Sequence, residues 1–280
     1  MGIEFPDGGC IRNKITFSLL GEKLTLIQNE DFIKAYPRPT YKGKLLSVTK
    51  VIVENVEESK INHYLEKIND LSDLLSFTTE SQVRYQGHDY PKEGSIKRRS
   101  STTGTIETWR PPFEIEYPAE LVKFINSCYD NYVQLRDSRQ LPIVFDYIYY
   151  SLRKETAVEI KLAMLFILLE NLKHTYALQT GYKYKDANGK SHPSPTNNND
   201  TLNFKRLLNE MLEKVGMTED LNDIKNFRND LIHEGLINRE NNLFKLYEKI
   251  MNIVREYIFR LLDFKGTFNC YTPGEQITLP

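Results

Sequence analysis

The chain of 280 residues is long enough to bury a hydrophobic core in one large domain or two ordinary ones. Its 37 lysines and arginines nearly balance 38 aspartates and glutamates. No overall field therefore draws it onto nucleic acid, and any nucleic-acid site has to be a local patch. The three cysteines, Cys10, Cys128 and Cys270, are too few and too widely spaced for a disulfide framework or a metal-ligand motif.

Targeting signals are not evident. The stretch from Met1 to Asp7 lacks the basic and apolar regions of a signal peptide. The longest apolar run, Leu162 to Leu169, has eight residues and is too short for a hydrocarbon layer of about 30 Å. With the reducing environment that the cysteines favour, we expect a cytoplasmic protein that has no contact with membranes.

Residues 1–56 have the patterns of β-strands. Apolar residues alternate with polar ones on both sides of a possible Gly21-Glu22 turn, at Ile15, Phe17 and Leu19 and then at Leu24 and Leu26. The β-branched stretch from Leu46 to Val56 predicts a further strand. Residues 58–78 then change to a helical period, with His63 on the polar side.

Short strands are expected at Val83–Tyr85 and at Ile106–Trp109, before Pro111-Pro112. That proline pair predicts a domain boundary, with a β-rich domain containing one long helix over residues 1–115 and a helical bundle over residues 116–280. The expected fold class is α+β, in which an all-α second part follows the β-rich first part.

Helical periodicity dominates after Tyr117. Pro118 and Pro142 suit the first turns of two helices, and further helices are predicted over 155–178, 202–215, 218–235 and 243–261. The segment from Ile160 to Leu169 is hydrophobic on nearly every side, which predicts a place at the centre of the bundle. Residues 180–200 have the composition of a long loop.

The helix predicted over residues 218–235 carries the main candidate site. Thr218 is a suitable N-cap and Gly235 a suitable end. Ile224, Phe227 and Leu231 form one apolar stripe, and Asn229 and His233 lie one turn apart on the other side, with Arg228 at the edge.

Arg228, Asn229 and His233 can converge on one substrate. A histidine with a pKa of about 6.5 accepts and donates protons at physiological pH, and a guanidinium stabilises charge developing on a phosphate. An asparagine amide can orient either partner. These groups suit cleavage of RNA by its own 2′-OH without a metal. The structural interpretation stays open: Arg228 can pair with Glu170 or Glu234, and His233 can simply stabilise a helix end.

The other histidines, His63, His88, His174 and His192, have no zinc spacing, and no phosphate loop or nucleophile elbow is present. We therefore expect no metal and no cofactor. Lys97, Arg98 and Arg99 are weak candidates for contact with an RNA backbone, as are Lys183, Lys185 and Lys190. The tyrosines between Tyr147 and Tyr150 are expected to be buried or in a dimer contact, although they could stack on bases.

The run Phe-Arg-Asn-Asp-Leu-Ile-His-Glu-Gly resembles the Arg-polar-x-x-x-His signature of the HEPN superfamily. The segment Leu165 to Leu172 is similar to an apolar-acidic helix of ApeA-like HEPN proteins, in which a β-containing region precedes the bundle. The resemblance covers residues 118–265, and residues 1–115 only by architecture.

This resemblance implies a metal-independent endoribonuclease of antiphage defence or a toxin system, acting as a homodimer with two motifs in one cleft. It implies that His233 is the acid and base, that Arg228 binds the scissile phosphate, and that Asn229 positions both. Glu170 would hold Arg228 in place, and the β-rich domain would sense a trigger or restrain the nuclease.

An antitoxin or regulatory partner is also implied. Gly235 stands where one toxin group has a modified tyrosine, so that form of control is not expected here. The alternative is a catalytically silent HEPN module that binds a nucleotide or a protein partner.

Overall fold

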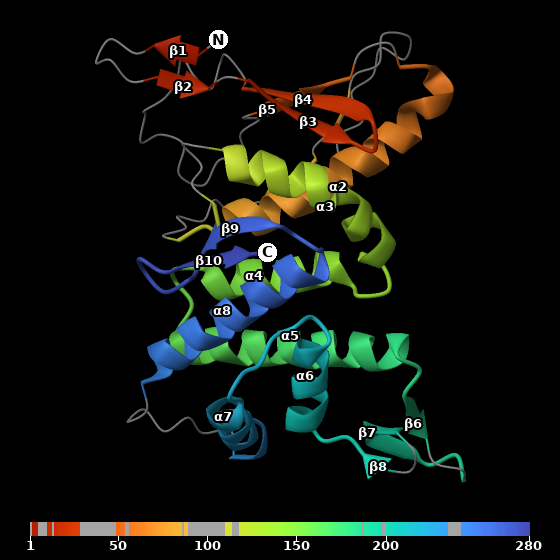
Figure 1. Ribbon diagram of the computed structural model, residues 1–280, viewed down its shortest axis with the longest axis vertical. Coiled ribbons are helices and arrows are strands. Elements are labelled where there is room, and N and C mark those ends of the chain that lie inside the picture. The colour runs from red at the N-terminus through yellow and green to blue at the C-terminus, as the bar shows by residue number, and fades with distance from the viewer. Residues whose placement is uncertain are drawn as a thin grey trace.

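The computed structural model has an α+β fold, with a small antiparallel sheet at one end of an elongated stack of helices (Figure 1). It describes residues 2–4, 10–12, 14–28, 49–53, 56–85, 87–88, 110–113, 118–185, 188–197, 200–234 and 242–280. Within these ranges, no helix is both long enough and apolar enough to cross a bilayer.

The N-terminal strands pair in two antiparallel groups, as their alternating pattern predicts. Their bounds are β1 Gly2–Glu4 and β2 Cys10–Arg12 in one pair, and β3 Lys14–Leu19, β4 Glu22–Gln28 and β5 Thr49–Ile52 in a sheet of that order. The hairpin turn is Leu20-Gly21 rather than the predicted Gly21-Glu22, because Leu19 pairs with Glu22. Both turn residues have positive φ, 50° and 81°, which is the turn geometry that matches the twist of paired strands.

Two long helices lie under this sheet (Figure 1). A short 3₁₀ turn, η2 at Glu58–Lys60, leads into α2 at Ile61–Thr79, and α3 spans Ala119–Leu135. The Ser18 amide donates to Asn126 Oδ1 on α3 at 2.8 Å, and Lys67 Nζ on α2 donates to the Leu19 carbonyl at 3.2 Å. Because Phe17, Leu19 and Leu24 are fully buried, the sheet shares its core with these helices.

The predicted strand at Val83–Tyr85 is wrong, because these residues adopt an irregular backbone with no ladder partner. Their contacts are made by side chains instead: the Ser76 hydroxyl exchanges hydrogen bonds with the backbone of Val83. Ile106–Trp109 and the basic residues Lys97, Arg98 and Arg99 lie outside the described residues.

The middle of the molecule is a stack of three helices, α4 at Leu141–Leu152, α5 at Val158–Gln179 and α8 at Leu243–Leu261. Helix α5 packs against α4, α8 and α6, as its predicted place in the bundle requires, but the expectation that it is buried on nearly every side is wrong, because one side is uncovered. Leu162, Leu165 and Leu169 are buried, whereas Ile160 and Ile167 on the opposite side are 53% and 50% exposed. An all-round apolar composition therefore does not mean all-round burial in this chain.

The C-terminal part is not all-α, which corrects that expectation. Residues predicted as a loop form a three-stranded antiparallel sheet with β6 Lys183–Lys185, β7 Ser191–Asn197 and β8 Asp200–Thr201. The β6–β7 ladder is irregular between Lys183 and Lys185, opposite the segment with Pro193 and Pro195, which have no N–H to donate. A hairpin of β9 Gly266–Asn269 and β10 Gln276–Leu279 follows α8.

The remaining helices are α6 at Phe204–Glu213 and α7 at Asn222–Glu234, which cross beside α5 at the end of the molecule away from the N-terminal sheet (Figure 1). Helix α6 is capped by Asn203, whose Oδ1 accepts the Arg206 amide at 3.0 Å.

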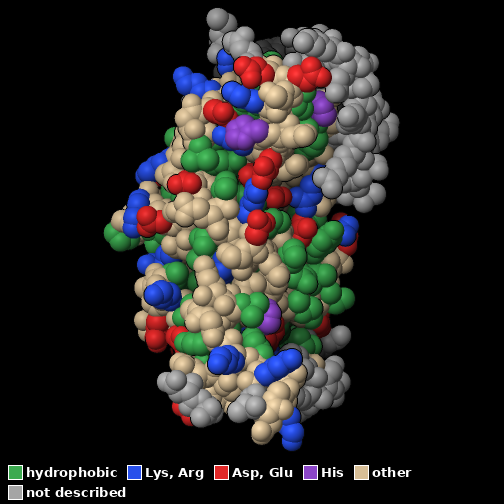
Figure 2. All heavy atoms as spheres, turned by 90° about the vertical axis from the view of Figure 1, so that its right-hand side faces the viewer, with side chains coloured by type: hydrophobic (Ala, Val, Ile, Leu, Met, Phe, Trp, Pro, Cys, Tyr) green, Lys and Arg blue, Asp and Glu red, His purple; other side chains and the backbone are tan. Residues whose placement is uncertain are grey.

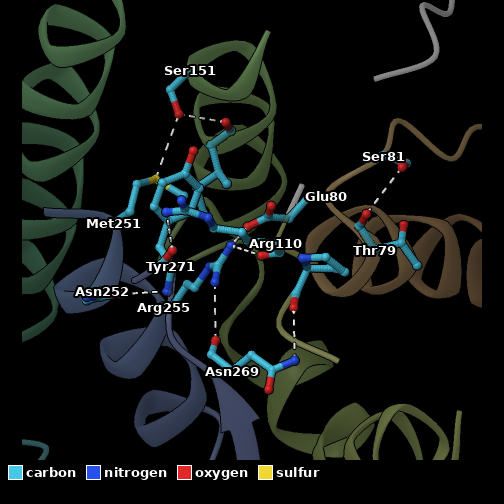
Figure 3. Close-up of polar contacts among 12 residues, drawn as sticks. Thr79, Glu80, Ser81, Arg110, Ser151, Met251, Asn252, Arg255, Asn269 and Tyr271 are labelled. Carbon is cyan, nitrogen blue, oxygen red and sulfur yellow. Dashed lines mark hydrogen bonds and ion pairs between the residues drawn. The ribbon is translucent and has the colours of Figure 1, made fainter. Parts of the chain in front are cut away.

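One hydrophobic core runs through the parts before and after residue 115. Phe77 of α2 stacks on Phe145 of α4 at 4.9 Å between ring centroids and packs on Phe259 of α8 at 5.2 Å. Beside these rings, Arg255 of α8 forms a wholly buried ion pair with Glu80, the residue after α2 (Figure 3). The predicted division into two domains at 115 stays a prediction, but the core joins both sides of it.

Candidate functional site

The helix with the Arg-Asn-x-x-x-His motif begins later than predicted. Helix α7 starts at Asn222, so Thr218 is not its N-cap. The Asp220 side chain accepts the Asn222 amide at 3.0 Å, and this short-range bond ends the preceding turn before the helix starts. The described part of α7 ends at Glu234, and Gly235 lies outside the described residues.

The apolar stripe of α7 faces the core as predicted. Ile224 and Phe227 are buried and Leu231 is half-buried against the core. This orientation leaves Arg228 and Asn229 half-buried, and the Arg228 side chain reaches Glu170 on α5.

Arg228 is held by a carboxylate on α5. Its Nε and Nη2 both donate to Glu170 Oε1, at 3.1 and 2.8 Å, and its Nη1 donates to Asn229 Oδ1 at 3.2 Å. These bonds use three of the five N–H groups of a guanidinium. The other two N–H groups have no partner among the described residues, and the side chain is 22% exposed, so Arg228 can still bind an anion.

A second cation shares the same carboxylate. Lys173, one turn along α5, lies 2.7 Å from Glu170 Oε2 and is only 8% exposed. The ring of Phe204, the first residue of α6, lies under both cations, 5.1 Å from the Arg228 guanidinium and 5.8 Å from Lys173 Nζ. Two cations therefore face one carboxylate, which leaves a local excess of positive charge. Lys173 and Phe204 were not singled out in the sequence because they come from other elements.

Asn229 lies next to Arg228 with its Oδ1 engaged, and its Nδ2, a donor, has no partner among the described residues. The backbone of His233 is on α7, one turn after Asn229, but its side chain lies outside the described residues. The structure therefore brings together Arg228, Asn229 and Glu170, and the predicted convergence of His233 with them stays a prediction.

An aromatic pair borders this cluster, and the sequence analysis did not connect it to the motif. His174 follows Glu170 by one turn of α5, and its Nδ1 lies 2.9 Å from the Tyr184 hydroxyl on β6. The two rings are 5.0 Å apart between centroids, inclined at 52°. Burial, with a smaller contribution from the Glu170 charge, raises the pKa of Tyr184 above its ordinary value of 10.0.

The weaker candidates are distributed elsewhere. Lys183, Lys185 and Lys190 are exposed on or next to the β6–β7 hairpin. In the tyrosine-rich part of α4, Tyr149 is buried and Tyr150 is 39% exposed, so burial accounts for part of that run. Figure 2 shows the side of the molecule that lies on the right in Figure 1. In the lower half of this face, lysine and arginine side chains lie beside hydrophobic ones, around a histidine.

Two other polar clusters do not offer a better site. The buried network around Arg255 and Glu80 is closed to solvent, since these side chains are 0% and 1% exposed (Figure 3). Burial raises the pKa of Glu80, and Arg255 opposes that shift. A groove of about 710 Å³ lies between α8 and β10, lined by charges of both signs that include Glu219, Glu256 and Lys245. It contains no residue of the motif.

Comparisons with known proteins give no assignment. No protein-family model matches the chain, and no curated protein or solved structure matches it. Within the described ranges, no three histidine, cysteine, aspartate or glutamate side chains gather in a group able to hold a metal ion. The candidate function therefore depends on the arrangement of Arg228 and its neighbours.

Proposed function

We propose that this protein is a HEPN-type endoribonuclease that cleaves RNA by attack of the 2′-OH on the adjacent phosphate. The supporting observation is the Glu170–Arg228–Asn229 arrangement, in which a carboxylate orients a guanidinium that keeps two N–H groups for an anion. The excess of one cation in the cluster with Lys173 favours a phosphate over a neutral ligand.

In this mechanism His233 takes the proton from the 2′-OH as that oxygen attacks phosphorus. The bond from phosphorus to the 5′-oxygen breaks, a protonated imidazole returns a proton to that oxygen, and a 2′,3′-cyclic phosphate remains. Arg228 stabilises the negative charge that builds on the phosphoryl oxygens, and Glu170 keeps the guanidinium in place. Asn229 donates from Nδ2 to orient the phosphate or the imidazole.

The proposed enzyme is a homodimer with α5 at its two-fold axis. The uncovered side of α5 follows a heptad-like spacing of four and three, with Ile160 and Ile167 exposed and Met164 half-buried between them. Leu178 continues this stripe after the polar Asn171 and His174. In an antiparallel pair of α5 helices, Ile160 of one copy meets Leu178 of the other, so the stripe is complementary to itself.

This pairing also brings two motifs together. The midpoint between positions 160 and 178 is position 169, next to Glu170. The two-fold axis is perpendicular to the plane that contains the two antiparallel helices, so the side of α5 that carries Glu170 faces the same direction in both copies. The two Glu170–Arg228 clusters therefore line one cleft. One His233 can then accept the proton while His233 of the second copy donates one. The proposed cellular role is a cytoplasmic effector of antiphage defence or of a toxin system, controlled through the N-terminal region or an antitoxin.

Incubation of the purified protein with RNA in excess EDTA tests the activity. We expect cleavage with cyclic phosphate ends, and a loss of about a hundredfold or more in both Arg228→Ala and His233→Ala. Arg228→Lys should also lose activity, because an ammonium lacks the fork that binds Glu170 and a phosphate together.

Lys225→Ala provides the control, because Lys225 is exposed on the same helix and makes no contact with Glu170. Its cleavage rate should equal that of the unmodified protein. Absence of cleavage of any RNA by a dimeric, folded protein would refute the nuclease and favour the silent binding module.

A further inference from the structure

The His174–Tyr184 pair is an ordered aromatic surface with no evident role in the proposed chemistry. His174 is exposed on α5, and Tyr184 is half-buried on β6. The 2.9 Å hydrogen bond between Nδ1 and the phenol fixes the orientation of both rings. Because Tyr184 packs against the core, the pair loses little further freedom when a ligand binds.

The pair lies beside the proposed phosphate site. Glu170 and His174 are one turn apart on α5, and the Glu170 charge is close enough to contribute to the raised pKa of Tyr184. At about 100° per residue, His174 lies about 40° from Glu170 around α5, between Glu170 and the exposed stripe. A polynucleotide bound by Arg228 therefore has these rings within reach of a neighbouring nucleotide.

We propose that the rings of His174 and Tyr184 bind a nucleobase of the RNA whose phosphate is bound by Arg228. Exposed aromatic rings next to a cation are the combination by which proteins bind unpaired nucleotides, with the base stacked and the phosphate paired. This inference rests on RNA as the ligand of the Arg228 site. It adds the element that selects which nucleotide lies next to the phosphate.

The structural alternative is that the pair only fixes β6 against α5. Tyr184→Phe separates the two roles, since it removes the hydrogen bond to His174 but keeps a ring for stacking. Tyr184→Ala and His174→Ala remove the rings. Tyr64→Ala is the matched control, because Tyr64 is a half-buried tyrosine of α2 whose ring contacts that of the exposed His63, outside the Arg228 cluster.

Binding is best measured with full-length His233→Ala protein, which does not cleave, using fluorescein-labelled oligo-A, oligo-C and oligo-U of about ten nucleotides. We expect one base to bind best, and Tyr184→Ala or His174→Ala to weaken that preferred oligonucleotide about tenfold. Tyr184→Phe should lose less than about threefold in affinity, and Tyr64→Ala should bind as the parent does. Thermal melting confirms that each variant is folded.

These measurements distinguish failure of this inference from failure of the nuclease. Base-dependent binding that is lost in Tyr184→Ala supports the proposed nucleobase site even if the active protein cleaves nothing. Equal binding of all three oligonucleotides by the parent and by folded Tyr184→Ala overturns the proposed nucleobase site, even if the protein is an efficient nuclease. Failure of the parent to bind any oligonucleotide overturns it as well.

Discussion

At the scale of single residues, the Arg228 site depends on a carboxylate that comes from another helix. Glu170 accepts two hydrogen bonds from Arg228 through one oxygen and contacts Lys173 through the other. The sequence allowed two interpretations of this pairing: a purely structural ion pair, and, through the HEPN resemblance, a carboxylate that holds Arg228 in place. The geometry favours both roles at once, because the paired guanidinium keeps two N–H groups for a phosphate.

Substitution of Glu170 tests its positioning role. Glu170→Ala should lower kcat by about 10- to 100-fold with a smaller change in KM, because a displaced guanidinium no longer matches the transition state. Glu170→Gln should recover part of this loss, since an amide oxygen still accepts from Nε and Nη2. Steady-state kinetics with melting temperatures check this. Parental kcat in a folded Glu170→Ala protein would remove Glu170 from the mechanism.

At the scale of elements, a partly exposed carboxylate and a buried lysine join the N-terminal sheet to α2. Glu22 of β4 lies 2.8 Å from Lys67, which is only 7% exposed. The contact with the Lys67 ammonium lowers the pKa of Glu22 below its ordinary 4.5. A lowered pKa in the folded state means that this contribution to stability is complete above pH 4.5 and is lost as the pH falls through the folded-state pKa.

We therefore expect Glu22→Gln to reduce the dependence of stability on acid pH. The urea midpoint of the unmodified protein should fall more steeply between about pH 5 and pH 3 than that of Glu22→Gln. Glu57→Gln is the matched control and should follow the unmodified protein, because Glu57 is exposed and its carboxylate has no ion-pair or hydrogen-bond partner among the described residues. Parallel profiles for Glu22→Gln and the unmodified protein would contradict the assignment.

The sequence predicted the helices more accurately than the short strands. Helices α2, α3, α6 and α8 follow from local periodicity, because an apolar stripe with a 3.6-residue period needs only one neighbouring surface to bury it. The sheet from β6 to β8 was missed, because its strands are polar, short and rich in proline. Such strands are held by pairing with each other and by packing of Tyr182 and Tyr184 on the core, which no local pattern reveals.

At the scale of the whole molecule, the exposed stripe of α5 indicates a missing neighbour. Ile160, Ile167 and Leu178 are each at least 50% exposed and lie along one side of a helix that is otherwise packed. Large exposed apolar patches of this kind mark interaction surfaces. The proximity of the stripe to Glu170 connects self-association to the candidate site.

A charge in the stripe tests the dimer. Ile167→Lys should convert a micromolar dimer to a monomer in light scattering and abolish cleavage, because it places two like charges near the two-fold axis. Ile52→Lys, at a 44% exposed position of β5, should leave both properties unchanged. A monomeric unmodified protein at that concentration would contradict the composite cleft.

The sequence by itself determined where most helices lie, which face of α7 is apolar, and that Arg228, Asn229 and His233 share one helix. These properties depend on neighbours within a few residues along the chain. Only the tertiary structure decided that Glu170 and Lys173 meet Arg228 over Phe204, that His174 and Tyr184 border this cluster, and that one side of α5 is uncovered. Each of these depends on which elements pack together, and that choice is made by the shared hydrophobic core rather than by any local sequence pattern.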